Sequence, residues 1–451
     1  MSKVALLFLL VFVGGSVAAL FYSSHFAFLV YQITYFLNPV DRWWGSQLPG
    51  SSYSFVAAVL MILVLAFRYR SLTEKGPWLQ HPSLKWLVAI LASYYLAYLW
   101  ALVPSAHDKF TFIFLKLTVV ILVAYKLLDS QKALNASIWA YVIGATYIGY
   151  LATSMGRNAG YRLEGIKLPE TGDVNPVAAA IVPAGVLLLY QVWMGNKTTK
   201  VICMVAGALV ANALVLFNSR GAFLGIVVSV GLYLMAMMFS RHRQKGQRGI
   251  AVVVVIAGLS GGYYVTDDVF WERMGTLENL ESRESGAGRM AYWWASVEMI
   301  AQDPKGLGVK GFNRLAPFYL SDEERGGTRF RAVHSMWFQA LTEIGVHGFL
   351  FFVLLLFSLY RLSRRTKQYL IDSRDYSGYF KVLALECALV GYLVTASFIN
   401  QFRAEILYWM ILLVAVASKV HYLQVSESKE PENVEETMPM RYGPRLPRRE
   451  P

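Results

Sequence analysis

The chain has 451 residues, of which 56% are hydrophobic and 16% are charged, and its formal net charge is +13. A soluble domain is about 45–50% apolar and about 25% charged, so this composition excludes a disordered or collagen-like chain and disfavours a soluble enzyme. The two cysteines, Cys203 and Cys387, both lie inside apolar runs, which excludes a disulfide framework and a thiolate metal site.

Apolar runs of membrane length recur along the chain. A helix needs about 20 mostly apolar residues to cross a bilayer core of about 30 Å. The runs therefore predict an all-α polytopic membrane protein with about twelve transmembrane helices and one long periplasmic loop carrying short helices. In chain order, the predicted spans are residues 4–22, 53–67, 84–103, 110–128, 133–153, 174–194, 201–217, 222–239, 250–265, 336–360, 380–398 and 404–418.

The predicted spans divide the chain into four parts. Residues 1–265 hold the first nine transmembrane helices, and the first span is kept as an anchor because no A-x-A-like cleavage site follows it. Residues 266–335 form the long loop, and residues 336–422 hold the last three helices. Residues 423–451 are first acidic and then basic and proline-rich, so they predict a disordered cytoplasmic tail.

The placement of lysine and arginine predicts the orientation. With the N-terminus inside, inner loops and span ends hold 18 of these residues, whereas the short outer loops hold seven. Because cytoplasmic loops carry an excess of Lys and Arg, both termini are predicted to be cytoplasmic. The basic balance then reflects topology, and no nucleic-acid partner is needed to explain it.

Polar residues at the outer ends of spans are the candidates for chemistry, because an ionisable group at membrane depth is costly. Arg162 and Asn175 lie in the loop of residues 154–175, and Arg220 lies in a very short hairpin. Arg289 opens a helical stretch of the long loop. His334, Gln339 and Glu343 stand where that loop re-enters the membrane.

Each candidate also has a structural interpretation. Arg220 fits an interfacial anchor whose charge reaches water, and Arg289 fits a solvated helix face. Trp293 and Trp294 fit the aromatic belt of a helix that lies on the membrane. His334 fits an interfacial histidine, since most of the other six histidines also lie near span ends.

The residue types favour metal-free chemistry on a phosphorylated lipid. No two histidines stand three or four residues apart, so the common helical spacing of a histidine metal site is absent from the sequence. Arginine offers a rigid fork of donors that matches phosphate oxygens, and a neutral histidine can take a proton from a hydroxyl. Together such groups would bind a lipid diphosphate and activate an acceptor alcohol.

Three stretches resemble the bacterial O-antigen ligase superfamily, which includes Wzy-type polysaccharide polymerases and protein O-oligosaccharyltransferases. They are Asn218-Ser219-Arg220-Gly221-Ala222, the run from Gly288-Arg289 through Gly306-Leu307-Gly308, and Val333-His334-Ser335 with Gln339 and Glu343-Ile344-Gly345. Many members carry Asn where this chain has Ser335. The motif resemblance covers about residues 155–360, and the remainder is similar by hydropathy.

The resemblance implies a metal-independent, inverting glycosyltransferase of the bacterial inner membrane that needs no cofactor. Its donor would be a glycan linked to undecaprenyl diphosphate. Arg220 and Arg289 would hold the diphosphate, and His334 would activate the acceptor hydroxyl. Arg162 and Asn175 would assist in donor binding, although the family order Pro-Asn is reversed here to Asn175-Pro176, and Gln339 and Glu343 would be supporting residues.

The acceptor and one rival class stay open at this point. A ligase hands the glycan to a lipid core, a polymerase to another lipid-linked repeat, and a protein transferase to a Ser or Thr hydroxyl. The remoter alternative is a polysaccharide transporter, which would be expected to carry charged or broken helices near the midplane. Lys116 and Glu386 are the main charges of that kind in this sequence.

Overall fold

The computed structural model describes residues 1–50, 52–243, 245–266, 268–275 and 286–425, and over these residues it is helical throughout, with no β-strand. This confirms the all-α fold class. The α-helices in chain order are α1 (Lys3–Phe21), α2 (His25–Leu37), α3 (Tyr53–Phe67), α4 (Tyr69–Thr73), α5 (Pro82–Leu96), α6 (Pro104–Leu127), α7 (Gln131–Met155), α8 (Val174–Met194), α9 (Lys197–Phe217), α10 (Arg220–Phe239), α11 (Gln247–Val265), α12 (Asp268–Gly275), α13 (Gly286–Gln302), α14 (Gly311–Tyr319), α15 (Met336–Asp372), α16 (Tyr376–Ala396) and α17 (Glu405–Ser418).

Within the described residues, eight helices are long and apolar enough to cross a bilayer: α1, α6, α8, α9, α10, α15, α16 and α17, the last extended to Leu423. The chain is therefore a multi-pass membrane protein. Two predicted spans differ in extent. The span at 84–103 is interrupted after Leu96 by a 3-10 turn, and the span at 336–360 belongs to a helix that continues to Asp372.

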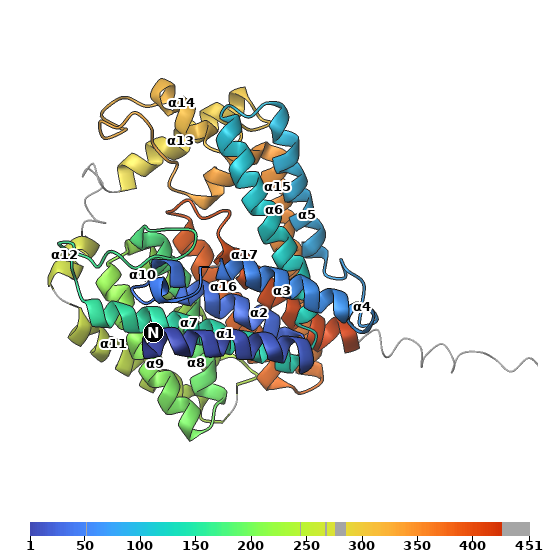
Figure 1. Ribbon diagram of the computed structural model, residues 1–451. Helices are drawn as coiled ribbons and strands as arrows, with labels where there is room; N and C mark the ends of the chain where they lie inside the picture. Colours follow the sequence, from blue (N-terminus) through green and yellow to red (C-terminus); the bar gives the residue numbers. More distant parts are fainter. Residues whose placement is uncertain (51, 244, 267, 276–285, 426–451) are drawn as a thin grey trace, which may run out of the picture.

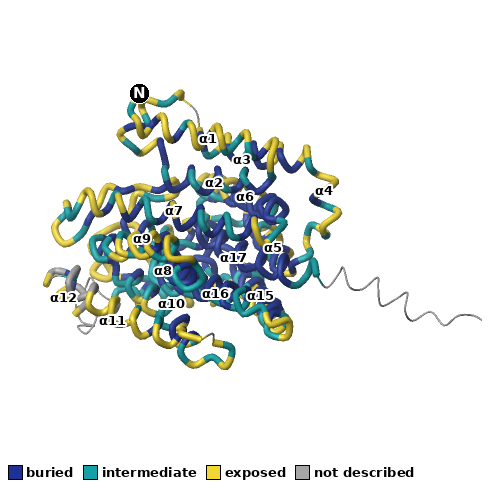
Figure 2. Tube along the Cα trace, turned by 90° about the horizontal axis from the view of Figure 1, so that it is seen from below, coloured by how far each residue is buried: buried dark blue, intermediate teal, exposed yellow. Residues whose placement is uncertain are grey.

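The core of the bundle surrounds α17. Every residue from Ile406 to Ser418 is buried, and Figure 2 shows this helix at the centre while α1 lies exposed at the edge. The ring of Trp409 packs edge-on against Tyr35 with centroids 4.9 Å apart and lies close to Phe28 and Tyr141. One indole thus joins α2, α7 and α17, so α2 is part of the core.

α2 was missed in the hydropathy analysis, and it changes the topology. The α1–α2 turn lies at one face of the bundle, where the hydroxyl of Ser24 donates to the carbonyl of Leu127. The far end of α2 lies at the other face, where Arg42 donates to the carbonyl of Lys167 at 3.1 Å. α2 therefore crosses from one face to the other, although it has only 13 residues.

The two ends of the described chain consequently lie on opposite faces. The backbone amide of Ser2 donates to Gln47 Oε1, beside the turn that holds Arg42, whereas Lys419 donates to the carbonyl of Tyr125 at the end of α6. This arrangement differs from one in which both termini lie on the same face of the bundle, and the cytoplasmic location of the two termini stays a prediction. Hydropathy alone does not count a 13-residue buried helix as a crossing, and each uncounted crossing reverses everything before it.

The part of the long loop from α13 onward is folded into a small unit at one end of the bundle. α13 and α14 pack through Tyr292, Met299 and Phe312, and Figure 1 shows them beside the upper ends of α5, α6 and α15. The predicted loop at 266–335 thus carries the short helices expected of it. The predicted disordered tail lies outside the described residues from 426 onward.

Candidate functional site

His334 stands at the junction between the long loop and α15. Its backbone adopts φ 52°, a left-handed conformation that is uncommon for a residue with a side chain, and its neighbours Val333 and Ser335 are buried. α15 begins two residues later at Met336. The buried neighbours hold this turn in place, so the imidazole is fixed at the N-terminal end of a long helix. Such locally strained backbone is found preferentially at functional sites.

α13 and the end of the long loop bring two arginines to His334. The ring of Tyr292 lies 6.1 Å from the imidazole, and its hydroxyl accepts a hydrogen bond from Arg331 Nε at 3.0 Å. Arg289 lies one turn before Tyr292 on α13, and both arginines are close enough to act on His334 electrostatically. The structure therefore brings together His334 and Arg289, which the sequence analysis singled out separately.

Arg220 opens α10 after an abrupt turn. Asn218 ends α9 in the left-handed conformation (φ 50°), and its side-chain amide donates to the carbonyl of Tyr161 at 3.0 Å. Because the turn is so short, Arg220 is held at the first position of α10. The exposed N–H groups of a helix N-terminus carry partial positive charge, so the helix and the guanidinium both favour an anion there.

Phe398 links the Arg220 turn to Arg289. A Cβ placed on Gly221 would stand 3.5 Å from the ring of Phe398, and the guanidinium carbon of Arg289 stands 5.9 Å from the same ring centroid. Trp293 lies against this ring as well and stacks on Phe338 of α15. Trp293 is therefore a packing residue, whereas the adjacent Trp294 is 65% exposed.

The loop that precedes α8 supplies the remaining predicted donor-binding residues, but each already has a local partner. Arg162 forms an ion pair with Glu164, with Nε and Oε1 2.8 Å apart. The side-chain and backbone nitrogens of Asn175 both donate to Asp173, the N-cap of α8. Asp173 in turn lies close enough to His334 to raise its pKa, so α8 contributes an acidic group to the site.

The surroundings of His334 lower its pKa to about 4. Partial burial has the largest effect because it disfavours the charged imidazolium, and the positive charges of Arg289 and Arg331 act in the same direction. At neutral pH the imidazole is therefore uncharged, which is the form that can accept a proton.

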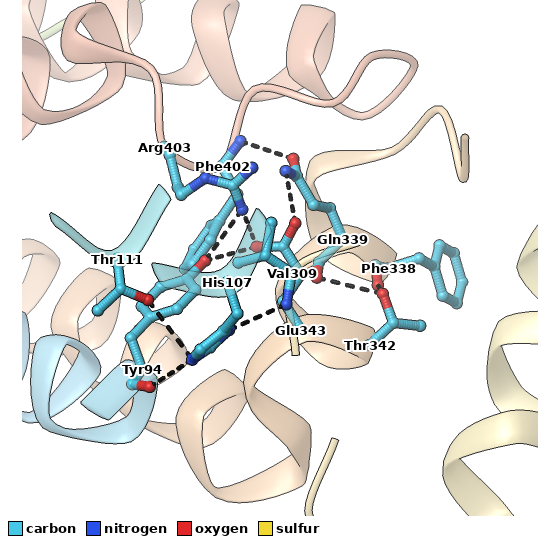
Figure 3. A network of polar contacts seen from close by, with 10 residues as sticks. All are labelled: Tyr94, His107, Thr111, Val309, Phe338, Gln339, Thr342, Glu343, Phe402 and Arg403. Atoms are coloured by element: carbon cyan, nitrogen blue, oxygen red, sulfur yellow. Dashed lines mark hydrogen bonds and ion pairs between the residues drawn. The ribbon is translucent and has the colours of Figure 1, made fainter. Parts of the chain in front are cut away.

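The two predicted supporting residues lie behind His334, in a buried network (Figure 3). Tyr94 of α5 donates to Glu343 Oε2 at 2.7 Å, and Gln339 donates to Glu343 Oε1 at 3.1 Å. Arg403 forms an ion pair with the same carboxylate, and the backbone amide of Phe402 donates to Gln339. Glu343 thus ties the start of α15 to α5 and to the loop before α17.

The same network anchors the long loop. His107 of α6 bonds through Nε2 to the carbonyl of Tyr94, and its Nδ1 accepts from the backbone amide of Val309. The backbone amide of Gly308 donates to the carbonyl of Glu343. The loop that carries α13 and its arginine is therefore fastened to α6 and α15, and through His107 to α5.

The contact between the long loop and α15 explains two glycines, Gly306 and Gly345, of the motifs that resemble the superfamily. Gly345 interrupts α15 with φ 68°, and a Cβ on it would stand 2.3 Å from the backbone of Lys305. Gly306 has φ 92°, and a Cβ on it would stand 2.4 Å from the backbone nitrogen of Gly345. The two backbones touch, so only glycine fits at either position.

Several residues of the site were not identified from the sequence. Arg331, Tyr292, Phe398 and Arg403 are placed by tertiary packing, and no motif marks them. Arg331 had one available signal, since it lies three residues before His334. His107 had none, because its partner Val309 is 202 residues away.

Chemically, the site is an arginine-rich mouth where the first turns of α10 and α13 stand near a neutral histidine at the start of α15. Such a mouth can bind a polyanion and leave a base beside it. Within the described residues, no group of three His, Cys, Asp or Glu is arranged to hold a metal ion. The fold and the site together define a multi-pass membrane protein with arginines and a histidine at one mouth of the bundle.

The family model described as O-antigen ligase (Wzy_C) matches residues 205–353. This match over residues 205–353 confirms the resemblance of the sequence to the O-antigen ligase superfamily. The match includes Arg220, Arg289, His334, Gln339 and Glu343 and ends within α15. A comparison with curated proteins gave no match.

Proposed function

We propose that the chain transfers a glycan from an undecaprenyl-diphosphate donor to an acceptor hydroxyl, with inversion and without a metal. The observation that carries this proposal is the position of Arg289 beside a neutral His334, with the N-terminus of α10 and Arg220 linked to Arg289 through Phe398. The family match supports the reaction class.

In the proposed donor site, Arg220 and Arg289 bind the diphosphate oxygens. Charge-assisted hydrogen bonds of this kind contribute about 1.5–3 kcal/mol each. As the glycosidic carbon separates from the diphosphate, negative charge grows on the leaving oxygen, and arginines already in position stabilise it without reorganisation. Arg162 and Asn175 stand farther along the same mouth and would contact the donor only by releasing Glu164 and Asp173.

His334 is the proposed base. It accepts the proton of the acceptor hydroxyl as the oxygen attacks the sugar carbon from the side opposite the diphosphate, which inverts that carbon. Donor binding assists this step electrostatically. A bound diphosphate offsets the positive charge of Arg289, one of the charges that lower the pKa of His334. The imidazole is therefore more basic in the donor complex than in the free protein.

The preferred acceptor is the lipid A core or a related surface lipid, as in a ligase. A growing lipid-linked polysaccharide and a protein hydroxyl are the alternatives, because all three reactions use the same donor chemistry. The glycan phenotype of a deletion strain distinguishes them. Loss of long chains from the lipid core supports a ligase, single-repeat caps support a polymerase, and unmodified glycoproteins support a protein transferase.

The experiment that tests the reaction uses purified protein, undecaprenyl-diphosphate-linked glycan and a lipid A core acceptor, with a chelator present throughout. We expect glycan on the acceptor and free undecaprenyl diphosphate in equal amounts, with the opposite anomeric configuration in the product. A retained configuration would contradict a single displacement with His334 as the base. Loss of activity in the presence of the chelator would contradict the metal-independent mechanism.

The site face is proposed to be periplasmic in a bacterial inner membrane. Reporters active only in the periplasm test this: a fusion near Glu323 should be active, and one near Arg243 inactive. Because α2 crosses the bundle, an N-terminal fusion should report the same side as Glu323. If the N-terminus instead reports the side of Arg243, then α2 does not cross in the membrane.

A further inference from the structure

The structure holds a pocket of about 550 Å³ between the outer ends of α5 and α6, and its lining residues differ from those of the His334 site. Its lining comes from two neighbouring helices and is of three kinds. Tyr95 and Tyr98 are aromatic, Asp108 and Lys109 are charged, and Phe112 and Ile113 are apolar, with Lys116 at the far end of the pocket.

Lys116 is unusual because of its depth. The apolar part of α6 begins at Phe110, so Lys116 stands six residues farther along, about 9 Å deeper at 1.5 Å per residue. Its ammonium group lies 4.9 Å from the ring centroid of Phe112, one turn back toward the site face. The side chain thus extends toward the membrane surface, as long basic side chains do.

The pocket has an excess of positive charge. The one carboxylate in its lining, Asp108, accepts a hydrogen bond from the hydroxyl of Tyr98 at 2.8 Å. In the described part of the chain, neither Lys109 nor Lys116 forms an ion pair with a carboxylate. A cation kept at this depth without an acidic partner is costly unless an anion reaches it.

The polarity of the lining decreases with depth, as the polarity of a lipid decreases from its headgroup to its acyl chains. Lys109 and the Tyr98 hydroxyl stand near the surface, whereas Phe112 and Ile113 stand deeper and are exposed on the side of the bundle. Polar groups at the mouth suit a headgroup, and apolar groups below suit the start of an acyl chain. A free ion would use only the polar half.

We propose that this pocket binds the phosphate headgroup of an anionic phospholipid from the leaflet on the site face, held by Lys109 and Lys116. Basic pockets between transmembrane helices are known to bind anionic lipid headgroups. The site is separate from the proposed donor site. α5 and α6 present Tyr94 and His107 to the Glu343 network, whereas Lys109 and Lys116 line the pocket outside it.

The test is lipid binding to the full-length protein in detergent, measured by native mass spectrometry and by thermal stabilisation. The probes are phosphatidylglycerol, phosphatidylcholine and inorganic phosphate. We expect phosphatidylglycerol to bind and stabilise more strongly than phosphatidylcholine, and inorganic phosphate to have no effect at equal concentration. Lys116→Met should weaken phosphatidylglycerol binding about fivefold, because a lysine near an anionic lipid surface contributes about 1 kcal/mol to binding.

Two further variants separate binding from folding. Lys116→Arg keeps the charge and should retain phosphatidylglycerol. Lys132→Met removes an exposed charge from α7 at the opposite face and should leave binding unchanged. The proposal is overturned if Lys116→Met binds phosphatidylglycerol as tightly as the unaltered protein. It is also overturned if inorganic phosphate stabilises the protein as much as phosphatidylglycerol does, or if phosphatidylcholine binds as tightly as phosphatidylglycerol.

Discussion

Two polar clusters lie near one another at the start of α15, and they are built on opposite principles. Around Glu343, the carboxylate is matched by Arg403, and Tyr94 and Gln339 complete its hydrogen bonds. Around His334, the positive charges of Arg289 and Arg331 lower the pKa of the imidazole, and Asp173 raises it. The first cluster is a closed network of hydrogen bonds and one ion pair, whereas the charges of the second act on a titratable imidazole.

The difference shows how the two clusters divide the work. A buried pair whose partners satisfy one another fixes geometry, and its removal disturbs folding. A titratable imidazole whose pKa depends on neighbouring charges also responds to the charge of a bound ligand. The Glu343 network therefore positions the elements that hold His334, and the His334 cluster is where we expect chemistry.

His334→Ala gives the largest expected change in activity and tests this division directly. General-base assistance contributes about 10²–10⁴ in rate, so transfer should fall by that factor while membrane insertion and donor binding persist. Turnover of the purified variant and its donor affinity are the measurements. Near-normal turnover would make His334 an interfacial histidine and leave the arginines to carry the reaction.

Glu343→Ala should instead destabilise the fold. It leaves Arg403 partly buried without its carboxylate, and breaking a buried ion pair costs about 3–5 kcal/mol. Unfolding in detergent should show this loss, and the double variant with Arg403→Met should recover part of it. The molecules that remain folded should still transfer glycan. A stable but inactive Glu343→Ala protein would place Glu343 in the chemistry.

Arg220→Lys should reduce transfer by an amount equivalent to about 1.5–3 kcal/mol, because an ammonium group cannot reproduce the fork of donors. Arg162→Lys is the matched comparison. Arg162 is already paired with Glu164, so its substitution should cost less. The catalytic efficiency kcat/KM of each folded variant is the measurement. Equal losses in the two variants would assign Arg162 a direct part in donor binding.

Arg331→Gln gives the smallest expected effect, a shift in the pH profile. His334 works as a base only when neutral, so kcat/KM falls as the pH drops through its pKa of about 4 in the free protein. Arg331 lowers this pKa, so its removal should move the acid limb to higher pH. Asp173 raises the pKa, and Asp173→Asn should move the limb the other way. An unchanged limb in both variants would show that another group controls the profile.

Much of the architecture could be predicted from the sequence for a simple reason. Apolar runs of membrane length and the order of the short motifs are local properties, and each requires only neighbouring residues to be recognised. The helical fold and the resemblance to the O-antigen ligase superfamily followed from them. The sequence also singled out Arg289 and His334, which the structure brings together.

Tertiary packing decided the rest. α2 is too short to stand out by hydropathy, and it crosses the bundle because Trp409, more than 370 positions later, packs against it. The acid–base partners of the site come from α5, α6, α8 and the loop before α17, at separations that no local pattern encodes. The position of α2 in the bundle and the surroundings of His334 therefore depended on contacts between segments far apart in the chain, which form only when the helices pack.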